Sequence, residues 1–444
     1  MGKVALIHPY FRTRSLTELL FSPLGAASLA AQLRRLGVET RIFDCTFWTA
    51  GKLRSALKAY QPGIVGIHSM VSMSGNAFRI ARMVRAELPA CLLVAGGPLP
   101  TLYPEMYSRE FDAVFRGESD LSFPRFCRDF FACQAGGEGL KRMPLQGYAG
   151  LFVRRQGLQV DNPSVHHTES EMDRFPVPDR GDFDHAAYQR AWYAKAGAKT
   201  ASLMTTYGCP FSCDFCSKPV FGQVLRRRNL DTVFEEVESL LRLGYDSLWI
   251  ADDSFTLSPS HLEGFCGRMD GRGIPWSCLS RANGIDAAAA RRMKRSGCRR
   301  VYLGLESGSQ ATLELMHKNA SLEEGISAVG RYHAAGIEVA AFFMVGYPGE
   351  TESAIEETYR LALALPLDYI SFNVPFPLPG SRLYERVSGR DEHKDWSEEN
   401  EVAFVYRSEF DARRLKRGIA ETMEAFARRR KHSPTIPWGP FGSG

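Results

Sequence analysis

The sequence predicts an α/β protein in which a doubly wound, Rossmann-like domain precedes an open, partial (β/α)6 barrel. In both halves of the chain short apolar runs alternate with amphipathic stretches, and a segment without such periodicity separates the halves. The length of 444 residues, with 44% hydrophobic and 24% charged residues, suits two folded domains. We therefore expect domains at residues 1–153 and 199–385, a linker at 154–198 and a short C-terminal segment at 386–444.

The first domain is expected to be a buried parallel sheet with helices between its strands. The expected strands are Val4–His8, Thr40–Asp44, Ile64–Ser69, Leu92–Gly97 and Ala113–Gly117. The stretches at 24–37, 52–60 and 76–88 have the period of amphipathic helices. In a doubly wound sheet the ligand crevice lies beyond the carboxyl ends of the strands, so the loops at Gly97 and Glu118 are expected to border it.

A second alternation of strands and helices begins near Thr200. Its expected strands are Ala201–Thr206, Ser247–Asp252, Trp276–Ser280, Arg300–Gly308, Glu338–Gly346 and Tyr369–Phe376, with helices near 231–243, 258–271, 286–296, 321–335 and 352–364. Ser321 and Glu324 have the spacing of a capping box. These βα steps are too few for a closed eight-unit barrel, so we expect an open one with its chemistry in the loops after the strands. A basic amphipathic helix at 411–432 is expected to pack on this barrel.

Three cysteines, Cys209, Cys213 and Cys216, are clustered just after the first barrel strand. Their C-x3-C-x2-C spacing suits a cubane 4Fe–4S cluster with one iron left open, whereas a structural zinc site needs a fourth Cys or His nearby. The chain lacks a signal peptide and a long apolar span, which predicts a cytoplasmic protein with reduced thiols and no membrane partner. A zinc- or cluster-bearing binding module remains the non-enzymatic alternative.

The cysteines and four later loops resemble the radical S-adenosylmethionine (SAM) superfamily over residues 200–385. The loops are IADDSF at 250–255, SRAN at 280–283, GLESGSQ at 304–310 and FMVGYPGET at 343–351, each after an expected strand. The resemblance implies that a 4Fe–4S cluster on the three cysteines reductively cleaves SAM to a 5′-deoxyadenosyl radical, which abstracts hydrogen from a substrate. It also implies cofactor contacts from Phe215, Asp252, Asp253, Arg281, Glu306, Ser307, Gly346 and Pro348.

The first domain resembles the cobalamin-binding domain of one radical SAM subgroup, through FSPLGAASLAAQLRRLGVETRIFD, GGPLPT and FRGESD. Members of that subgroup commonly methylate unreactive carbon, and others catalyse cyclisation or ring contraction. Leu99 stands where the GG-x-H-x-T block frequently has His, and there is no D-x-H-x-x-G cobalt-ligand motif, which weakens the case for cobalamin. His8 and His68 at strand ends are alternative ligands, although interior packing is the simpler interpretation of both.

A short C-terminal segment and the altered block resemble the radical SAM diol dehydratase of aminoglycoside (apramycin-type) antibiotic biosynthesis. This resemblance implies loss of a hydroxyl from an amino-sugar diol, an electron donor such as flavodoxin or ferredoxin, and a partner reductase. Cobalamin-dependent C-methylation in specialised metabolism is the alternative; a tRNA-modifying enzyme is a more distant one, and no nucleic-acid partner is expected. Candidate groups toward the substrate are Tyr207, Lys218, Tyr347, Asn373 and Glu118, with Asp120 beside the last.

Overall fold

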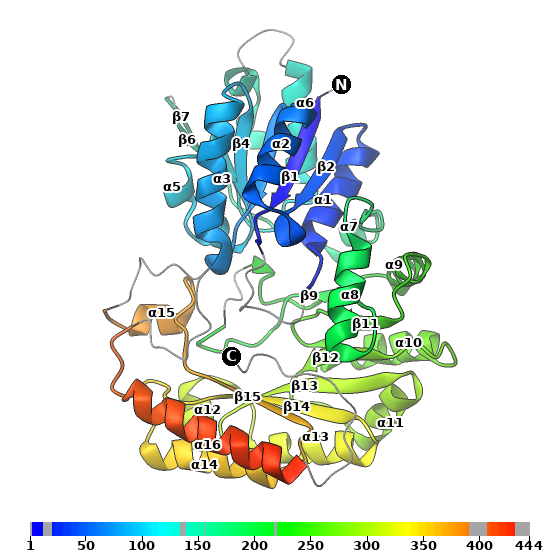
Figure 1. Cartoon of the computed structure of the whole chain (residues 1–444), viewed down its shortest axis with the longest axis vertical. Coiled ribbons are helices and arrows are strands. Elements are labelled where there is room, and N and C mark those ends of the chain that lie inside the picture. Colours follow the sequence, from blue (N-terminus) through cyan, green and yellow to red (C-terminus); the bar gives the residue numbers. More distant parts are fainter. Residues whose placement is uncertain are drawn as a thin grey trace.

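A computed structural model describes residues 2–11, 20–133, 139–155, 157–216, 220–389 and 406–430. The chain forms two mainly parallel sheets, one in each half, and these occupy separate parts of the molecule in Figure 1. The strand order is β2-β1-β3-β4-β5-β6-β7 in the first sheet and β15-β14-β13-β12-β11-β8 in the second. The predicted α/β fold, a doubly wound domain followed by a partial six-stranded barrel, is therefore confirmed.

The first sheet is apolar on both faces because helices cover both of them. Its parallel strands are β1 (Lys3–His8), β2 (Glu39–Asp44), β3 (Ile64–His68), β4 (Leu92–Gly96) and β5 (Ala113–Phe115). Helices α1 (Leu24–Arg35) and α6 (Ser122–Cys133) pack on one face, and α2 (Ala50–Tyr60) and α3 (Ser74–Glu87) pack on the other. Two short helices, α4 (Pro98–Leu102) and α5 (Pro104–Tyr107), follow β4. The crossover helices leave the carboxyl ends of the strands open to form a site.

The sheet continues beyond the expected domain boundary at residue 153. Strands β6 (Leu151–Arg155) and β7 (Leu158–Asp161) form a hairpin whose first strand pairs antiparallel with β5. The segment expected to be a linker also contains α7 (Glu169–Met172) and α8 (His185–Ala196). Trp192 on α8 is buried, and its indole N–H donates to the Leu20 carbonyl at 2.7 Å. Part of the expected linker is therefore regular structure packed against the first domain.

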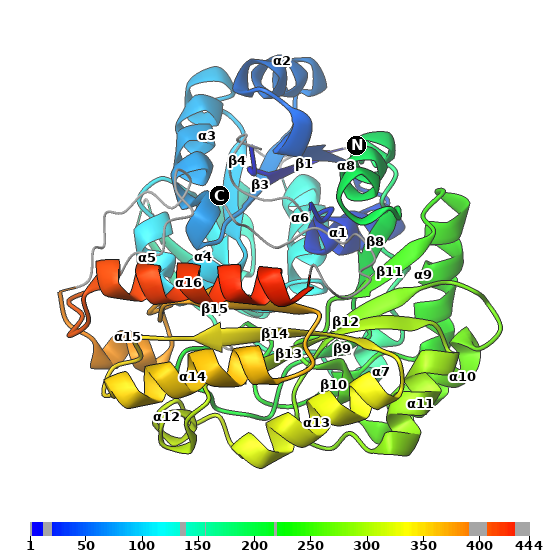
Figure 2. The same ribbon diagram turned by 60° about the horizontal axis from the view of Figure 1, so that its bottom comes forward.

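The second sheet is entirely parallel. Its strands are β8 (Thr200–Leu203), β11 (Ser247–Ile250), β12 (Trp276–Ser280), β13 (Cys298–Glu306), β14 (Glu338–Met344) and β15 (Tyr369–Asn373). The connecting helices are α9 (Leu230–Arg242), α10 (Pro259–Met269), α11 (Ala287–Arg295), α12 (Gln310–Leu315), α13 (Leu322–Ala334) and α14 (Glu352–Ala364), and they lie along its outer side in Figure 2. The predicted capping box is confirmed, since Ser321 and Glu324 exchange hydrogen bonds at the start of α13.

Two helices complete the described chain. Helix α15 (Arg382–Arg386) follows β15, and α16 (Ala412–Arg430) lies beside α14 in Figures 1 and 2. Leu415 and Phe426 of α16 join the apolar core of the barrel, as predicted for the basic C-terminal helix. Of the helices that the structure describes, none is both long and apolar enough to span a membrane.

Candidate functional site

The three cysteines lie in a long loop between two short antiparallel strands, β9 (Thr206–Tyr207) and β10 (Arg226–Arg227). Main-chain hydrogen bonds fold this loop back on itself: the Cys209 N–H donates to the Gly222 carbonyl at 3.3 Å, and the Cys216 N–H donates to the Cys213 carbonyl at 3.2 Å. We call residues 208–216 the cysteine loop. Lys218, a candidate general acid, lies outside the described residues.

The donor set of the cysteine loop suits an iron–sulfur cluster. None of its cysteines is in a disulfide; Cys209 is buried, while Cys213 and Cys216 are half-buried. Over the part of the chain that the structure describes, no three His, Cys, Asp or Glu side chains converge as they would around a single metal ion. A cubane cluster does not require such convergence, because each thiolate binds a separate iron. The three cysteines remain the predicted ligands.

Arg281 secures the cysteine loop to the end of the sheet. It follows β12, where its N–H donates to Ser254 Oγ at 3.1 Å. Its guanidinium lies 3.7 Å from the centre of the Phe211 ring, and its Nη1 donates to Cys213 Sγ at 3.3 Å. Its Nη2 donates to the Lys318 carbonyl. The predicted contact of Arg281 with the SAM carboxylate is still a prediction, and its contacts with Cys213 and Phe211 were not predicted.

A buried ion pair lies at the end of β13. Lys318 Nζ is 2.6 Å from Glu306 Oε1, and the two side chains are only 7% and 11% exposed. Glu306 has a backbone φ of 65°, a left-handed conformation that is strained for a residue with a side chain. Lys318 Nζ also lies 5.8 Å from the centre of the Phe215 ring, beside the cysteine loop. The predicted SAM-binding carboxylate therefore has a cationic partner that sequence analysis missed.

Ser307, predicted to contact SAM, is held within the protein core. It is fully buried, its Oγ lies 3.1 Å from Thr358 Oγ1, and it accepts the Ser309 N–H at 3.1 Å. These hydrogen bonds join the start of α12 to α14 and give Ser307 a structural role. Its predicted contact with SAM would have to compete with them.

We expect Ser307→Ala to lower the free energy of unfolding by about 1 kcal/mol, because two hydrogen bonds at a buried helix start are lost. If the role of Ser307 is structural, its Oγ would make no contact with SAM, and the affinity for SAM should stay within about twofold. Urea denaturation and equilibrium SAM binding measure the two effects. Ser353→Ala, at an exposed site on α14, is the control and should change stability by less than about 0.5 kcal/mol. A tenfold loss of SAM affinity in Ser307→Ala would instead support a direct contact.

The two predicted aspartates after β11 have different surroundings. Asp252 is completely buried and accepts hydrogen bonds from the Thr205 N–H at 2.6 Å, Thr205 Oγ1 at 2.6 Å and Thr206 Oγ1 at 2.8 Å. Burial raises the pKa of Asp252 to about 6, although these hydrogen bonds oppose the shift. Asp253 is exposed. Asp252 thus fixes the turn between β8 and β9, and Asp253 is the better placed of the two for the predicted SAM contact.

The loop after β14, where a main-chain contact with adenine is predicted, is a turn held by a carboxylate. Gly346 has a φ of 80°, and its N–H donates to Glu350 Oε2 at 2.8 Å. The Tyr347 N–H donates to the same oxygen at 3.1 Å, so Glu350 holds the turn that contains Pro348. Burial raises the pKa of Glu350 to about 7. The predicted roles of Gly346 and Pro348 depend on this turn.

Several candidate substrate groups have structural surroundings instead. Tyr347 is fully buried in an apolar cluster with Met316 and Leu383, and burial raises its pKa far above the ordinary range. Burial also raises the pKa of Tyr207, which packs edge-on against Phe221 with ring centres 5.2 Å apart. Tyr347 is removed from solvent, and a phenol whose pKa lies far above neutral is a weak general acid there. Tyr207 is half-buried and remains a candidate. Asn373 is exposed at the end of β15 and remains a candidate.

The carboxylate of Glu118, the group expected to face substrate amines, pairs with Arg226. The two side chains form a bidentate pair with distances of 2.7 and 2.6 Å, and each is less than a tenth exposed. Arg226 lies on β10, just after the cysteine loop, whereas Glu118 follows β5 of the first sheet. Asp120 accepts a hydrogen bond from Ser28 Oγ at 2.6 Å. The predicted contact of Glu118 with substrate amines stays a prediction, and the pair with Arg226 links the two halves of the chain.

The carboxyl end of the first sheet has a close backbone approach at Gly97 and two buried histidines, of which His8 has an Nδ1 without a hydrogen-bond partner. Gly97 has a φ of 110°, and a Cβ there would lie 2.7 Å from the Ser69 carbonyl oxygen and 2.8 Å from His68 Nδ1. Leu99 belongs to the apolar core. The rings of His8 and His68 are 5.6 Å apart, and burial lowers their pKa values to about 4 and about 3. Both imidazoles are neutral members of this packed end of the sheet.

The carboxyl end of the first sheet faces the cysteine loop. The Glu118–Arg226 pair connects the loop after β5 to β10, and Arg226 also donates to the His167 carbonyl at 2.8 Å. Tyr103, between α4 and α5, lies with its ring centre 6.4 Å from that of Tyr384 on α15. The carboxyl end of the first sheet therefore contacts β10 and α15, two elements of the second half.

Comparison with known proteins decides the family. A model of the B12 binding domain matches residues 17–126, and a model of the Radical SAM superfamily matches residues 203–362. The chain is 32% identical over 374 residues to an uncharacterized methyltransferase of Pyrococcus horikoshii, an alignment that covers 82% of the chain and 78% of that protein. The chain belongs to the radical SAM superfamily. As a radical SAM enzyme it uses a 4Fe–4S cluster and SAM.

Two further proteins match both halves of the chain. It is 25% identical over 420 residues to an anaerobic magnesium-protoporphyrin IX monomethyl ester cyclase of Cereibacter sphaeroides, covering 91% of this chain and 67% of the cyclase. The structure of TsrM, a radical SAM methyltransferase from Kitasatospora setae with cobalamin and a [4Fe–4S] cluster bound, superimposes with a TM-score of 0.73 and 19% identity. That match covers 86% of this chain and 77% of TsrM, so the shared fold extends over both sheets.

Proposed function

We propose that this radical SAM enzyme is a cobalamin-dependent methyltransferase acting on a small-molecule substrate. The observation that carries the proposal is the placement of the B12-binding half against the second half. The loop after β5 contacts β10 through the Glu118–Arg226 pair, and the loop after β4 contacts α15 through Tyr103 and Tyr384. Methyl transfer between two cofactors needs this proximity, because the reacting groups must be held in the same water-excluded site.

The bound groups would supply reductive SAM cleavage and a transferable methyl group. Three features of the chain would prepare the site for them. The cysteine loop would hold the cluster, with Arg281 against Cys213. The tight backbone at Gly97 would shape the crevice loop beside the corrin, since a side chain there would clash with the Ser69 carbonyl and His68. Neutral His8 and His68 would border that face without adding charge.

Methylation replaces amino-sugar dehydration as the preferred reaction for two reasons. Glu118, the carboxylate expected to face substrate amines, is neutralised by Arg226, so the crevice loses an anionic group suited to an amino sugar. The 32% identical relative is named as a methyltransferase, and so is TsrM; neither these proteins nor the cyclase is named as a dehydratase. A methyltransferase of this kind still needs an electron donor such as flavodoxin or ferredoxin, but no partner reductase for the product.

The test is cobalamin retention and methyl transfer by the anaerobically reconstituted enzyme. We expect about one cobalamin to remain with each chain after gel filtration, and label from methyl-deuterated SAM to appear in the cobalamin fraction. Gly97→Ala should retain less cobalamin while keeping its iron, because the new methyl group would meet the Ser69 carbonyl and His68. Cleavage of SAM to 5′-deoxyadenosine with no cobalamin retained would refute methylation and return dehydration to first place.

A further inference from the structure

Asp214, between the second and third cysteines, is bonded through its main chain to two distant segments. Its N–H donates to the Met316 carbonyl at 3.0 Å, and its own carbonyl accepts the Leu383 N–H at 3.0 Å. Its side chain is 1% exposed. Both main-chain groups of this residue are therefore bonded to segments more than a hundred positions away, one after α12 and one in α15.

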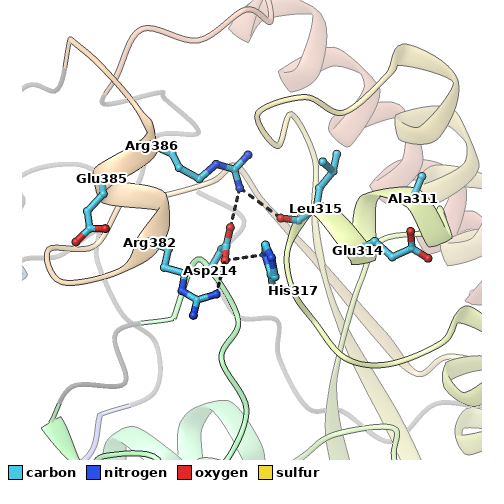
Figure 3. Close-up of a pocket in the computed structure, with 8 residues that line it drawn as sticks. All are labelled: Asp214, Ala311, Glu314, Leu315, His317, Arg382, Glu385 and Arg386. Atoms are coloured by element: carbon cyan, nitrogen blue, oxygen red, sulfur yellow. Dashed lines mark hydrogen bonds and ion pairs between the residues drawn. The ribbon is translucent and has the colours of Figure 1, made fainter.

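The buried carboxylate of Asp214 is neutralised by the same two segments. Arg386 Nη1 donates to its Oδ2 at 2.6 Å, and His317 Nδ1 lies 2.9 Å from its Oδ1 (Figure 3). Arg382 is more distant, at 4.0 Å, and its side chain is 60% exposed. A carboxylate so far removed from water is tolerated only when a cation and hydrogen bonds replace its hydration. Arg386, the nearer of the two arginines, is therefore the cation that stabilises the Asp214 carboxylate.

The partners of Asp214 are fixed by their own surroundings. Arg386 also donates to the Leu315 carbonyl at 3.4 Å, and its guanidinium lies 5.8 Å from the centre of the Tyr347 ring. His317 has a left-handed backbone, with a φ of 49°. Such strain in a residue with a side chain persists only where neighbouring contacts hold it.

Apolar packing joins the same two regions. The cluster contains Met316, Tyr347, Leu383, Val387 and Tyr406, with Phe215 of the cysteine loop packed against it. The outer side of this contact is open: Asp214 and Arg386 border a surface cavity of about 870 Å³ (Figure 3). Helix α15 and its flanking residues therefore support the cysteine loop through both polar and apolar contacts.

We propose that Asp214 and Arg386 form a positioning pair that fixes Cys213 and Cys216 for cluster retention. Asp214 is next to Cys213 and two residues before Cys216, so any shift of its backbone moves both thiols. Groups that orient metal ligands without touching the metal typically change retention about 10- to 100-fold when they are removed. The inference depends on the radical SAM cluster and is independent of whether the enzyme transfers a methyl group.

The experiment follows chelator-driven loss of cluster absorbance from the anaerobically reconstituted full-length enzyme. In Arg386→Gln the buried carboxylate loses its cation, and we expect cluster loss to become about tenfold faster. Arg386→Lys should recover most of the retention, since it restores the charge. The double variant Asp214→Asn/Arg386→Gln should lose its cluster more slowly than Arg386→Gln alone, because no unpaired buried charge remains. The electron paramagnetic resonance spectrum of the reduced cluster should change in Arg386→Gln and return toward wild type in Arg386→Lys.

Arg382→Gln is the matched control, because Arg382 lies on the same helix and borders the same cavity at a greater distance from Asp214. It should retain its cluster as the wild type does. Circular dichroism of each cluster-free chain distinguishes a variant that is unfolded from one that binds the cluster more weakly. If Arg386→Gln does not fold, the rates of cluster loss are compared between the wild type, Arg386→Lys and the double variant. Equal rates of cluster loss in wild type, Arg386→Lys and the double variant, with unchanged spectra, would overturn the proposal.

Discussion

Simultaneous replacement of Cys209, Cys213 and Cys216 by alanine should reduce SAM cleavage to the background of a protein-free reaction. Thiolates are the iron ligands in clusters of this class, and the loop offers no replacement for them. Without a cluster no electron can be transferred to SAM, so we expect SAM cleavage to be lost completely rather than partly. Anaerobic iron determination and detection of 5′-deoxyadenosine by mass spectrometry measure the effect.

Cys133→Ser provides the control for this experiment. Cys133 is a half-buried cysteine on α6, in the other half of the chain from the cysteine loop. The serine variant should keep the iron content and the cleavage rate of the wild type. If the triple alanine variant retained a full complement of iron, the assignment of the cluster to the cysteine loop would be wrong.

Glu236→Gln is expected to lower the free energy of unfolding by about 3–5 kcal/mol. Glu236 on α9 has no exposed side-chain surface and lies between two arginines, 2.6 Å from Arg180 Nη2 and 2.8 Å from Arg228 Nη1. Both guanidiniums are at most 10% exposed, and Arg180 also donates to the Ser202 carbonyl. The variant would leave two buried cations without their shared anion. Urea denaturation of the cluster-free chain measures the change.

The effect should depend on pH with a definite sign. Burial opposes ionisation of Glu236, but attraction to Arg228 and Arg180 and their hydrogen bonds outweigh it and hold the pKa of Glu236 below its ordinary value of 4.5. The stabilisation is therefore present above pH 4.5 and is lost as the pH falls through the lowered pKa of Glu236. The difference in free energy of unfolding between Glu236→Gln and the wild type should narrow over the same fall in pH.

Glu352→Gln is the matched control for Glu236→Gln. Glu352 pairs with Arg414 at 3.0 Å, but both side chains are more than half exposed, so the loss should stay below about 1 kcal/mol. A similar loss in both variants would contradict the importance of burial.

The strands were predictable because parallel strands buried on both faces are almost continuously apolar, as in Val301–Leu305. The β6–β7 hairpin was missed although its signal is present: Gly157, with a φ of 79°, forms the turn between two short alternating runs. Its strands were too short and too charged to stand out from the linker.

The loops that form the site could be predicted from the sequence, but the partners of their side chains could not. Glu118 does lie at the carboxyl end of the first sheet, but its partner Arg226 is 108 positions further along the chain, and no local pattern indicates that pairing. Asp252 carried the expected sequence context, yet Thr205 and Thr206 occupy its oxygens. Local sequence places a residue on a loop, whereas distant hydrogen bonds decide whether it is available to a ligand.

The Glu118–Arg226 pair also constrains how the molecule can open. Any hinge motion that parted the first sheet from the cysteine loop would have to separate two charges that are almost completely sheltered from water, and would expose the hydrogen bonds of Arg226 with the His167 and Phe221 carbonyls. Separating a buried ion pair is costly, so this contact disfavours wide opening. A ligand enclosed between the halves would then be released only when the pair separates.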